Sequence, residues 1–552
     1  MNINIKTLTL SACAVALISS CTDLDVEMHK YEQFPDNDIA ISGEFEGCYY
    51  YHRNEAWFGR NFWEGYFLGG DEAVGVNYAG SYDDAGRYRR PALHDFGTDV
   101  PGCGQWGEMQ SGITYTNGRI LLYGGAEGKD PIVAPLRAIR AYYHFWLMEI
   151  YGDIPILDHQ LEEGEFVDRM PRAEVAKWIE SELLEVIPDL NEANDISTYG
   201  RPNRWMAEAL LAKLYLNWGV YTNPITEVTG TTANEKLNDC VAICDDIIKS
   251  GLFEVGKGYR MKFFPDNGDG KIKDFIYACP MDPATYGGAV YWAAHEMNRW
   301  FEFRSYGFLS PNTWGWTPTQ TQAGNFVLTP ECVDRFNLPG DERNIMIAVG
   351  PQYMFDENFE KTDIPINLYS DARHRKLIHQ LNYSKEVDWV DLELFDVGSE
   401  GDLENFEKGA RLYKYPPRQE DDLMWGRKQT NDIPVFRYAD ILLTKAECIM
   451  RGAQATNGDT PASLINEVRD CSSAPHVTGV PTMDELLDER GREFILEPWR
   501  RNDLIRFGKF ENCGKWQVAA SPKTMADKTK RLMPVPTDIL NTNTNWSQNP
   551  GY

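Results

Sequence analysis

Aromatic side chains that could form a flat binding surface are concentrated between residues 286 and 316. This stretch reads YGGAVYWAAHEMNRWFEFRSYGFLSPNTWGW, and Tyr286 and Trp292 lie in its first half. Sugars expose flat C–H faces as well as hydroxyl groups, so aromatic rings can cover the faces while Asn, Asp and Arg bond the hydroxyls. Rigid rings lose little conformational entropy and often dominate binding energy. These aromatic residues are therefore candidates for a flat binding surface.

Two further features support binding residues in loops. Trp314 and Trp316 stand between Pro311 and Pro318, which is typical of an exposed loop, where binding residues are commonly found. A second candidate, residues 77–90 (NYAGSYDDAGRYRR), is polar and includes Tyr82, Asp83 and Arg87. For each of these aromatic residues the alternative is ordinary packing in the core.

Motifs for catalysis and for cofactors are weak. The sequence has no HExxH, GxSxG or CxxC motif. Residues 102–107 fit GxGxxG without a preceding hydrophobic strand, and residues 251–257 lack the Ser or Thr of a phosphate loop. In PDNGDGKIKD (265–274), Pro265 and Ile276 occupy positions where a calcium loop needs carboxylates. We expect turns, no cofactor and no metal, although paired carboxylates of a glycosidase could not be recognised from sequence.

Charge and cysteine usage exclude other classes. The formal net charge of −29 argues against nucleic acid as a partner, because phosphate binding needs clustered Lys and Arg. The eleven cysteines are scattered and do not form a disulfide framework. Cys240 and Cys244, four residues apart, are expected on one face of a helix as small core residues.

The N-terminal residues indicate secretion. A short apolar run from Leu8 to Ile18 follows Lys6 and suits the hydrophobic region of a signal peptide. Ile18-Ser19-Ser20-Cys21 resembles the lipobox of bacterial lipoproteins, which implies cleavage after residue 20 and acylation of Cys21. The acidic residues after Cys21 resemble an export signal to the cell surface. The alternatives for Cys21 are an ordinary signal peptide with a chance cysteine and a buried cysteine in a first helix. The alternative for the acidic residues is a solvated tether.

Helical periodicity frames an irregular central region. Ile139, Tyr143, Trp146 and Ile150 lie on one face of a predicted helix. Further helices are expected near residues 171–188, 207–218, 235–250, 435–450, 464–468 and 483–497. Residues 256–432 lose this periodicity, and a structureless loop of that length is improbable inside one domain. We therefore predict a helical scaffold with an irregular second lobe.

Several segments together resemble the SusD/RagB family of outer-membrane nutrient-binding lipoproteins. They are LRAIRAYYHFWLMEIYGDIPI (136–156), GRPNRWMAEALLAKLYL (200–216), IPVFRYADILLTKAE (433–447), LINEVRD (464–470), DERGREFILEPWRRNDLIRFGKF (488–510) and LMPVPTDILNTNTNWSQNPGY (532–552). One departure is Pro498, where the family usually has glycine.

The resemblance implies a mostly α fold of tetratricopeptide-like helix pairs. We expect a signal peptide (1–20), a lipidated tether (21–30) and one domain (31–552). Within that domain a helical scaffold spans about 31–255 and 433–510, a ligand-binding lobe spans 256–432, and an extended tail spans 531–552.

The resemblance also implies a function. Members are not enzymes; they bind glycans or peptides at the cell surface and lie on a SusC-like TonB-dependent transporter that takes up the ligand. We expect an oligosaccharide ligand at Trp314, Trp316, Trp292, Tyr286, Tyr82, Asp83 and Arg87. The alternatives are a peptide ligand, a surface-anchored glycan hydrolase and a purely structural adaptor. The charged residues Glu489, Arg492, Glu493, Arg500, Arg501 and Asp503 are interpreted as ion pairs of the scaffold.

Overall fold

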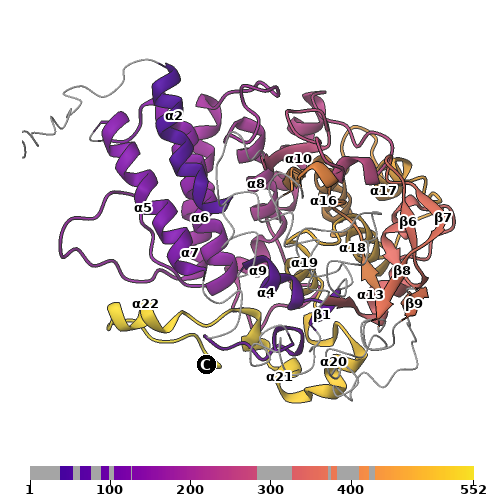
Figure 1. Ribbon diagram of the computed structural model, residues 1–552. Coiled ribbons are helices and arrows are strands. Elements are labelled where there is room, and N and C mark those ends of the chain that lie inside the picture. The colour runs from indigo at the N-terminus through magenta and orange to yellow at the C-terminus, as the bar shows by residue number, and fades with distance from the viewer. Residues whose placement is uncertain are drawn as a thin grey trace, which may run out of the picture. The chain divides into compact units, whose positions relative to one another are not determined.

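The computed structural model in Figure 1 describes residues 38–53, 62–75, 89–98, 105–125, 127–281, 326–370, 375–378, 380–381, 409–421 and 429–552. The chain divides into two compact units, residues 1–46 and residues 47–552. The described part of the first unit is residues 38–46, which belong to one helix. All contacts given below lie within the second unit.

Helices dominate the described residues. They are α2 (Asp38–Tyr49), α4 (Phe62–Leu68), α5 (Trp106–Tyr123), α6 (Ala134–Tyr151), α7 (Arg172–Val186), α8 (Arg204–Leu216), α9 (Trp218–Thr222), α10 (Leu237–Lys249), α13 (Pro330–Arg335), α16 (Tyr438–Met450), α17 (Pro461–Ser472), α18 (Met483–Glu493), α19 (Arg500–Arg506), α20 (Lys515–Ala520), α21 (Pro522–Ala526) and α22 (Thr537–Thr542).

The strands are short and form antiparallel pairs. The six pairs are β1 (Ala73–Gly75) with β3 (Phe326–Leu328), β2 (Phe275–Cys279) with β12 (Ile433–Arg437), β4 (Ile347–Ala348) with β11 (Arg411–Leu412), β5 (Gly350–Pro351) with β10 (Gln380–Leu381), β6 (Tyr353–Phe355) with β7 (Lys361–Pro365), and β8 (Asn367–Ser370) with β9 (Arg375–Ile378). The predicted mostly α fold is confirmed.

Consecutive helices pack against one another and form the scaffold. Helix α6 contacts α5 and α7, α8 contacts α7 and α10, and α10 contacts α16 from beyond the irregular region. Helices α5, α6 and α7 lie side by side in Figure 1, while α16, α17 and α18 gather on the other side. The helical segments before and after residues 256–432 therefore form one continuous packing arrangement.

Helix α6 is buried on every side, so its charged residues need partners. Arg137 binds Glu182 of α7 through two bonds of 2.9 and 2.8 Å, and Arg140 binds the same carboxylate. Just beyond the helix, Asp153 accepts a hydrogen bond from the Arg172 backbone N–H at 2.8 Å. These pairs confirm that Arg137 and Asp153 hold the scaffold together.

Two predicted helices begin or end at other residues. Val435 fits the apolar pattern of the following helix, but it lies in β12, because Pro434 and its neighbours pair with β2. Helix α16 starts only at Tyr438, where Asp274 accepts hydrogen bonds from the N–H groups of Tyr438 and Ala439. Helix α18 ends at Glu493 and not near residue 497, because the chain turns at Leu496, whose φ is +63°.

The third predicted helix is also divided. Trp218 belongs to the separate helix α9, because α8 ends at Leu216. The Asn234 side chain donates to the carbonyl oxygens of Tyr215 and Leu216, at 2.9 and 3.1 Å. These bonds satisfy carbonyls that the end of α8 leaves free.

The C-terminal tail is not extended throughout, since it contains α22. It closes the end of α6: Met533 donates its backbone N–H to the Ile150 carbonyl at 2.8 Å, and Asn549 donates to the Tyr151 carbonyl at 2.8 Å. Gly152, with φ of +80°, leaves room there for Leu532, whose side chain would lie 2.7 Å from an added Cβ.

A chain of buried charges links α18 to the irregular lobe. Glu493 binds Arg343 at 3.0 Å and Arg437 at 2.6 Å. Arg437 also binds Glu497 at 3.0 Å, and Glu497 binds Lys414 at 2.7 Å. Breaking one such buried pair leaves an uncompensated charge, which costs about 3–5 kcal/mol.

Five of the six charged residues interpreted from sequence as ion pairs of the scaffold form buried ion pairs: Glu489, Arg492, Glu493, Arg500 and Asp503. The sixth, Arg501, is also buried, and it donates to the Lys530 carbonyl at 3.0 Å. Cys240 and Cys244 also lie in the core, and every described cysteine is a buried free thiol. Among the described residues, no helix is long and apolar enough to cross a membrane.

Candidate functional site

The residues predicted to bind ligand lie outside the described residues: Trp314, Trp316, Trp292, Tyr286, Tyr82, Asp83 and Arg87. The proposed lipidation site, Cys21, also lies outside them. The structure does describe the strands and loops from which these segments extend. These strands and loops show where the described chain leaves and re-enters around each predicted segment.

Strands β1 and β3 form an antiparallel pair in which Gly75 lies opposite Phe326. In sequence, residue 75 comes just before the second candidate stretch, residues 77–90, and residue 326 follows the aromatic stretch, residues 286–316, by ten residues. The described chain therefore leaves β1 beside the point where it enters β3.

The other end of the aromatic stretch is fixed by β2 and β12. Cys279 lies opposite Ile433 in this pair. Just beyond β2, the Met281 backbone N–H donates to the Asp432 carboxylate at 2.7 Å. The chain thus enters residues 282–325 from a position held by a buried carboxylate.

A buried ion cluster holds the start of β1. Asp71 accepts hydrogen bonds from Arg500 of α19 at 2.7 and 2.6 Å and from Arg335 of α13 at 2.7 Å. Burial alone would raise the pKa of Asp71, but the two guanidinium groups lower it to about 2. The carboxylate is therefore ionised at neutral pH and joins two helices to the strand.

The next residue, Glu72, has a different environment. Its side chain is fully buried, and neither carboxyl oxygen has a hydrogen-bond partner in the described part of the chain. Burial raises the pKa of Glu72 to about 8 despite the nearby Arg500 and Arg335. The Glu72 backbone carbonyl accepts the Thr329 N–H at 3.0 Å, just after β3.

A polar cavity of about 380 Å³ lies where β2 ends and β12 begins. We call it the Tyr199 hollow; it is lined by residues from 196–201, 266–271 and 430–432, with Pro280 and Arg418. Its floor is Asp432, which is 5% exposed and accepts a hydrogen bond from the Tyr199 hydroxyl at 2.7 Å.

The loop 266–271 is fixed against that floor. Asn267 donates its side-chain amide to the carbonyls of Lys262 and Asp432, and its amide oxygen accepts the Asp432 N–H at 2.7 Å. An added Cβ on Gly268 would lie 2.3 Å from the Asp432 carboxylate. Asn267 is thus engaged in holding the loop, which agrees with a turn and not with the calcium-loop interpretation of residues 265–274.

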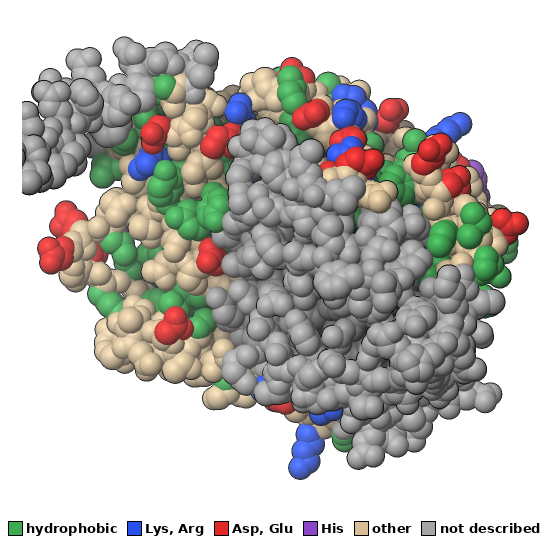
Figure 2. Space-filling view, viewed as in Figure 1, with side chains coloured by type: hydrophobic (Ala, Val, Ile, Leu, Met, Phe, Trp, Pro, Cys, Tyr) green, Lys and Arg blue, Asp and Glu red, His purple; other side chains and the backbone are tan. Residues whose placement is uncertain are grey.

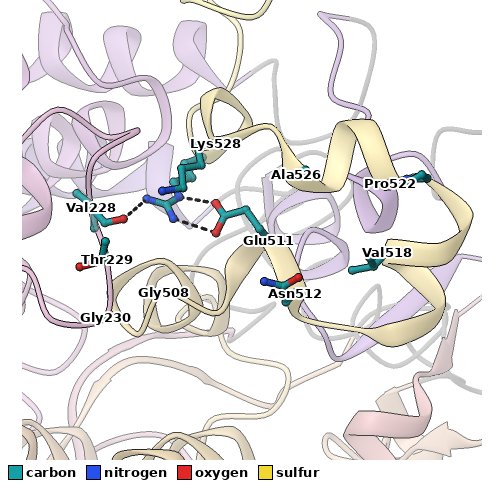
Figure 3. A pocket seen from close by; sticks show the side chains of 11 residues that line it. Val228, Thr229, Gly230, Gly508, Glu511, Asn512, Val518, Pro522, Ala526 and Lys528 are labelled. Atoms are coloured by element: carbon teal, nitrogen blue, oxygen red, sulfur yellow. Dashed lines mark hydrogen bonds and ion pairs between the residues drawn. The ribbon is translucent and has the colours of Figure 1, made fainter.

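A second cavity, of about 320 Å³, is shown in Figure 3. It lies between residues 228–230 and the C-terminal segment containing Glu511 and Val518. Arg531 in its wall binds both Glu511 oxygens, at 2.6 and 2.9 Å, and the carbonyls of Ile225 and Val228. Because these bonds already occupy its guanidinium, Arg531 links residues 225–228 to the C-terminal segment and is not available for a ligand.

A third cavity, of about 400 Å³, contains both acids and bases around Asp71 and Arg335. Across the described ranges, no group of three or more His, Cys, Asp or Glu side chains is arranged to hold a metal ion.

On the face in Figure 2, acidic and basic side chains are intermingled over the upper part of the described surface.

Sequence reasoning identified Arg500 as a residue of the scaffold but did not find its partner Asp71, nor the pair of Tyr199 and Asp432. Asp71 and Arg500 are 429 residues apart, and Tyr199 and Asp432 are 233 apart. A buried partner has no local sequence pattern, although the acidic pair Asp71-Glu72 before a short apolar run is a visible feature.

The chain matches known families in two regions. Residues 304–552 match the SusD family, and residues 134–216 match a family described as "Starch-binding associating with outer membrane". The starch-binding protein SusD of Bacteroides thetaiotaomicron is 27% identical over 441 residues, which cover 76% of this chain and 72% of the relative.

Solved structures share the fold over most of the chain. A SusD superfamily protein from Parabacteroides distasonis has a TM-score of 0.65 with 19% identity, covering 93% of this chain and 99% of that one. Surface glycan-binding protein A from Bacteroides thetaiotaomicron, solved with laminarihexaose, has a TM-score of 0.63 with 18% identity and the same coverage. The family matches and the sequence relative confirm the predicted resemblance to the SusD/RagB family, and the solved structures show that this chain shares the fold of SusD superfamily proteins.

Proposed function

We propose that this protein is a lipoprotein of the bacterial cell surface that captures oligosaccharide and passes it to a SusC-like TonB-dependent outer-membrane transporter. The observation that carries the proposal is the similarity to a starch-binding protein over 76% of the chain. A structural neighbour solved with laminarihexaose supports a glycan as the ligand class. Binding is non-covalent and involves no bond cleavage.

The proposed site combines the two aromatic stretches predicted from sequence. The β1–β3 pair supports this, because residue 75, which precedes one stretch in sequence, lies opposite residue 326, which follows the other. In this arrangement the rings of Trp314 and Trp316 cover sugar faces, while Asp83 and Arg87 bond hydroxyl groups.

Binding is tested on the mature chain without its lipidated cysteine, residues 22–552, by calorimetry with maltohexaose and laminarihexaose and on a wider glycan array. Trp314→Ala and Trp316→Ala should each weaken binding about tenfold or more, as loss of a central aromatic contact usually does. Phe166→Ala is the matched control, since Phe166 is 44% exposed and lies in the connection between α6 and α7. Unchanged affinity in both Trp variants would show that the site is elsewhere.

The same protein also separates binding from catalysis. Incubation of polysaccharide with the wild-type chain should release no reducing sugar, while affinity electrophoresis in the same polysaccharide should retard the protein. Release of product would instead favour the surface-anchored hydrolase, and retention of peptides without glycans would favour a peptide-binding member of the family.

Anchoring and delivery need cellular experiments. Metabolic labelling with a fatty-acid analogue should label the wild-type chain and not Cys21→Ala, and external protease should reach the labelled protein on intact cells. The transporter should co-purify with the anchored protein from detergent extracts. An unlabelled wild-type chain recovered from the cytosol would contradict the proposal.

A further inference from the structure

We propose that the Tyr199 hollow is a second saccharide subsite, which binds a neutral sugar unit of a glycan held by the aromatic stretches. The inference rests on the proposed function and adds a separate place of contact built entirely from described residues. The hollow measures about 380 Å³, within the range of small-molecule binding pockets.

The charges in the hollow favour an uncharged polar ligand. Its cations are Arg201, Lys271 and Arg418, and its carboxylates are Asp266, Asp269 and Asp432. This balance stands out in a chain with a net charge of −29. Sugar hydroxyls both donate and accept hydrogen bonds, so a mixture of cationic donors and anionic acceptors suits them better than it suits an ion of either sign.

Most of these groups are held in place before any ligand arrives. Arg418 binds Asp266 and, at 3.1 Å, Asp421, and it donates to the Thr430 hydroxyl at 3.2 Å. Thr430 in turn donates to Asp421 at 2.7 Å. Side chains fixed in this way lose little conformational freedom on binding, which favours affinity.

Two rim residues remain available to hydroxyl groups. Asp269 is exposed and has no ion-pair partner within the described ranges, and the Lys271 ammonium donates only to the Asp266 carbonyl there, at 3.0 Å. Tyr199, Pro280 and Ile196, which is 66% exposed, supply apolar surface on another side. A sugar ring presents a C–H face to the apolar side and hydroxyls to the charged side.

The sequence connects the hollow with the proposed site. Pro280 in its wall precedes the aromatic stretch by six residues, and the Asp432 carboxylate accepts the Met281 N–H at 2.7 Å. In this proposal a chain of several sugar units contacts both the stretch and the hollow, whereas a disaccharide contacts the stretch alone.

The test uses the double variant Asp269→Asn/Lys271→Ala in the mature chain. Asp269 has a φ of +58°, a conformation that asparagine also tolerates, so the backbone is preserved. Glu174→Gln/Lys177→Ala is the matched control, because these residues form an exposed ion pair of 2.9 Å on α7. Calorimetry compares maltohexaose and laminarihexaose with the disaccharides maltose and laminaribiose.

The expected result is about a tenfold loss of hexasaccharide affinity in the hollow variant, with disaccharide affinity, Tm and the control unchanged. Hexasaccharide affinity equal to wild type would overturn the inference and leave the proposed function standing. An equal loss for both chain lengths would also overturn it, since it indicates a disturbed aromatic site. If the wild-type protein binds neither hexasaccharide, the inference fails together with neutral-glycan capture.

Discussion

Replacing Asp71 by asparagine should destabilise the protein strongly, because this carboxylate is the only bridge between Arg335 and Arg500 in the described cluster. The substitution keeps the shape of the side chain and removes its charge. The Arg500 guanidinium, 6% exposed, then loses the carboxylate that it binds, and Arg335 keeps only the longer pair with Asp488 at 3.7 Å. The loss of one partner from a buried ion pair costs about 3–5 kcal/mol.

The pKa of Asp71 gives a second estimate. It is held at about 2, against an ordinary value of 3.8, and one pKa unit corresponds to about 1.4 kcal/mol. The ionised carboxylate therefore stabilises the fold by about 2 kcal/mol at neutral pH. Because the folded-state pKa is the lower one, this stabilisation is complete above about pH 4 and is lost as the pH falls through about 2.

Urea unfolding followed by tryptophan fluorescence measures the change. We expect Asp71→Asn to lose about 2–5 kcal/mol at pH 7, roughly half as much at pH 3, and little at pH 1.5. The control is Asp95→Asn, whose ion pair with Arg90 spans 3.0 Å at the surface and should contribute less than about 1 kcal/mol. Equal stabilities of the two variants at pH 7 would refute the assigned role of the cluster.

Two other substitutions test buried groups near the same scaffold. Burial raises the pKa of Glu72 to about 8 in the folded protein, whereas the unfolded chain releases this proton near pH 4.5. The stability of the folded protein therefore falls as the pH rises from about 4.5 to about 8. Glu72→Gln, which cannot ionise, should raise Tm at pH 8 and not at pH 4. Gly112→Ala should lower the free energy of unfolding in urea by about 1–3 kcal/mol, because the added Cβ would lie 2.8 Å from the Tyr143 ring. The control is Gly107→Ala on the same helix, whose Cβ meets nothing within 4 Å and should not destabilise the protein.

The sequence predicted the scaffold where local patterns and tertiary packing agree. The expected start of a helix at Pro171 is one residue from that of α7, and the expected end at Gly251 follows α10 closely, with Gly251 at φ of +66°. Prediction failed at β12, because Val435 continues the apolar spacing of α16. Only pairing with β2, more than 150 residues away, makes that segment a strand.

The candidate site was predictable in composition and not in position. Trp and Tyr residues mark residues 286–316 in the sequence, and these remain a prediction. Their neighbours in space depend on strand register, such as Gly75 opposite Phe326, which no short sequence pattern specifies. The Tyr199 hollow combines three segments that are unremarkable separately, so its polar lining becomes visible only in the folded chain.

The contacts between residues 533–549 and the end of α6 have a consequence for the order of folding. Asn549 and the Tyr151 carbonyl are 398 residues apart, so this closure must wait until the intervening polypeptide has been synthesised. Until then the last turn of α6 lacks the Asn549 hydrogen bond, and Gly152 lacks its contact with Leu532, so both are exposed to water.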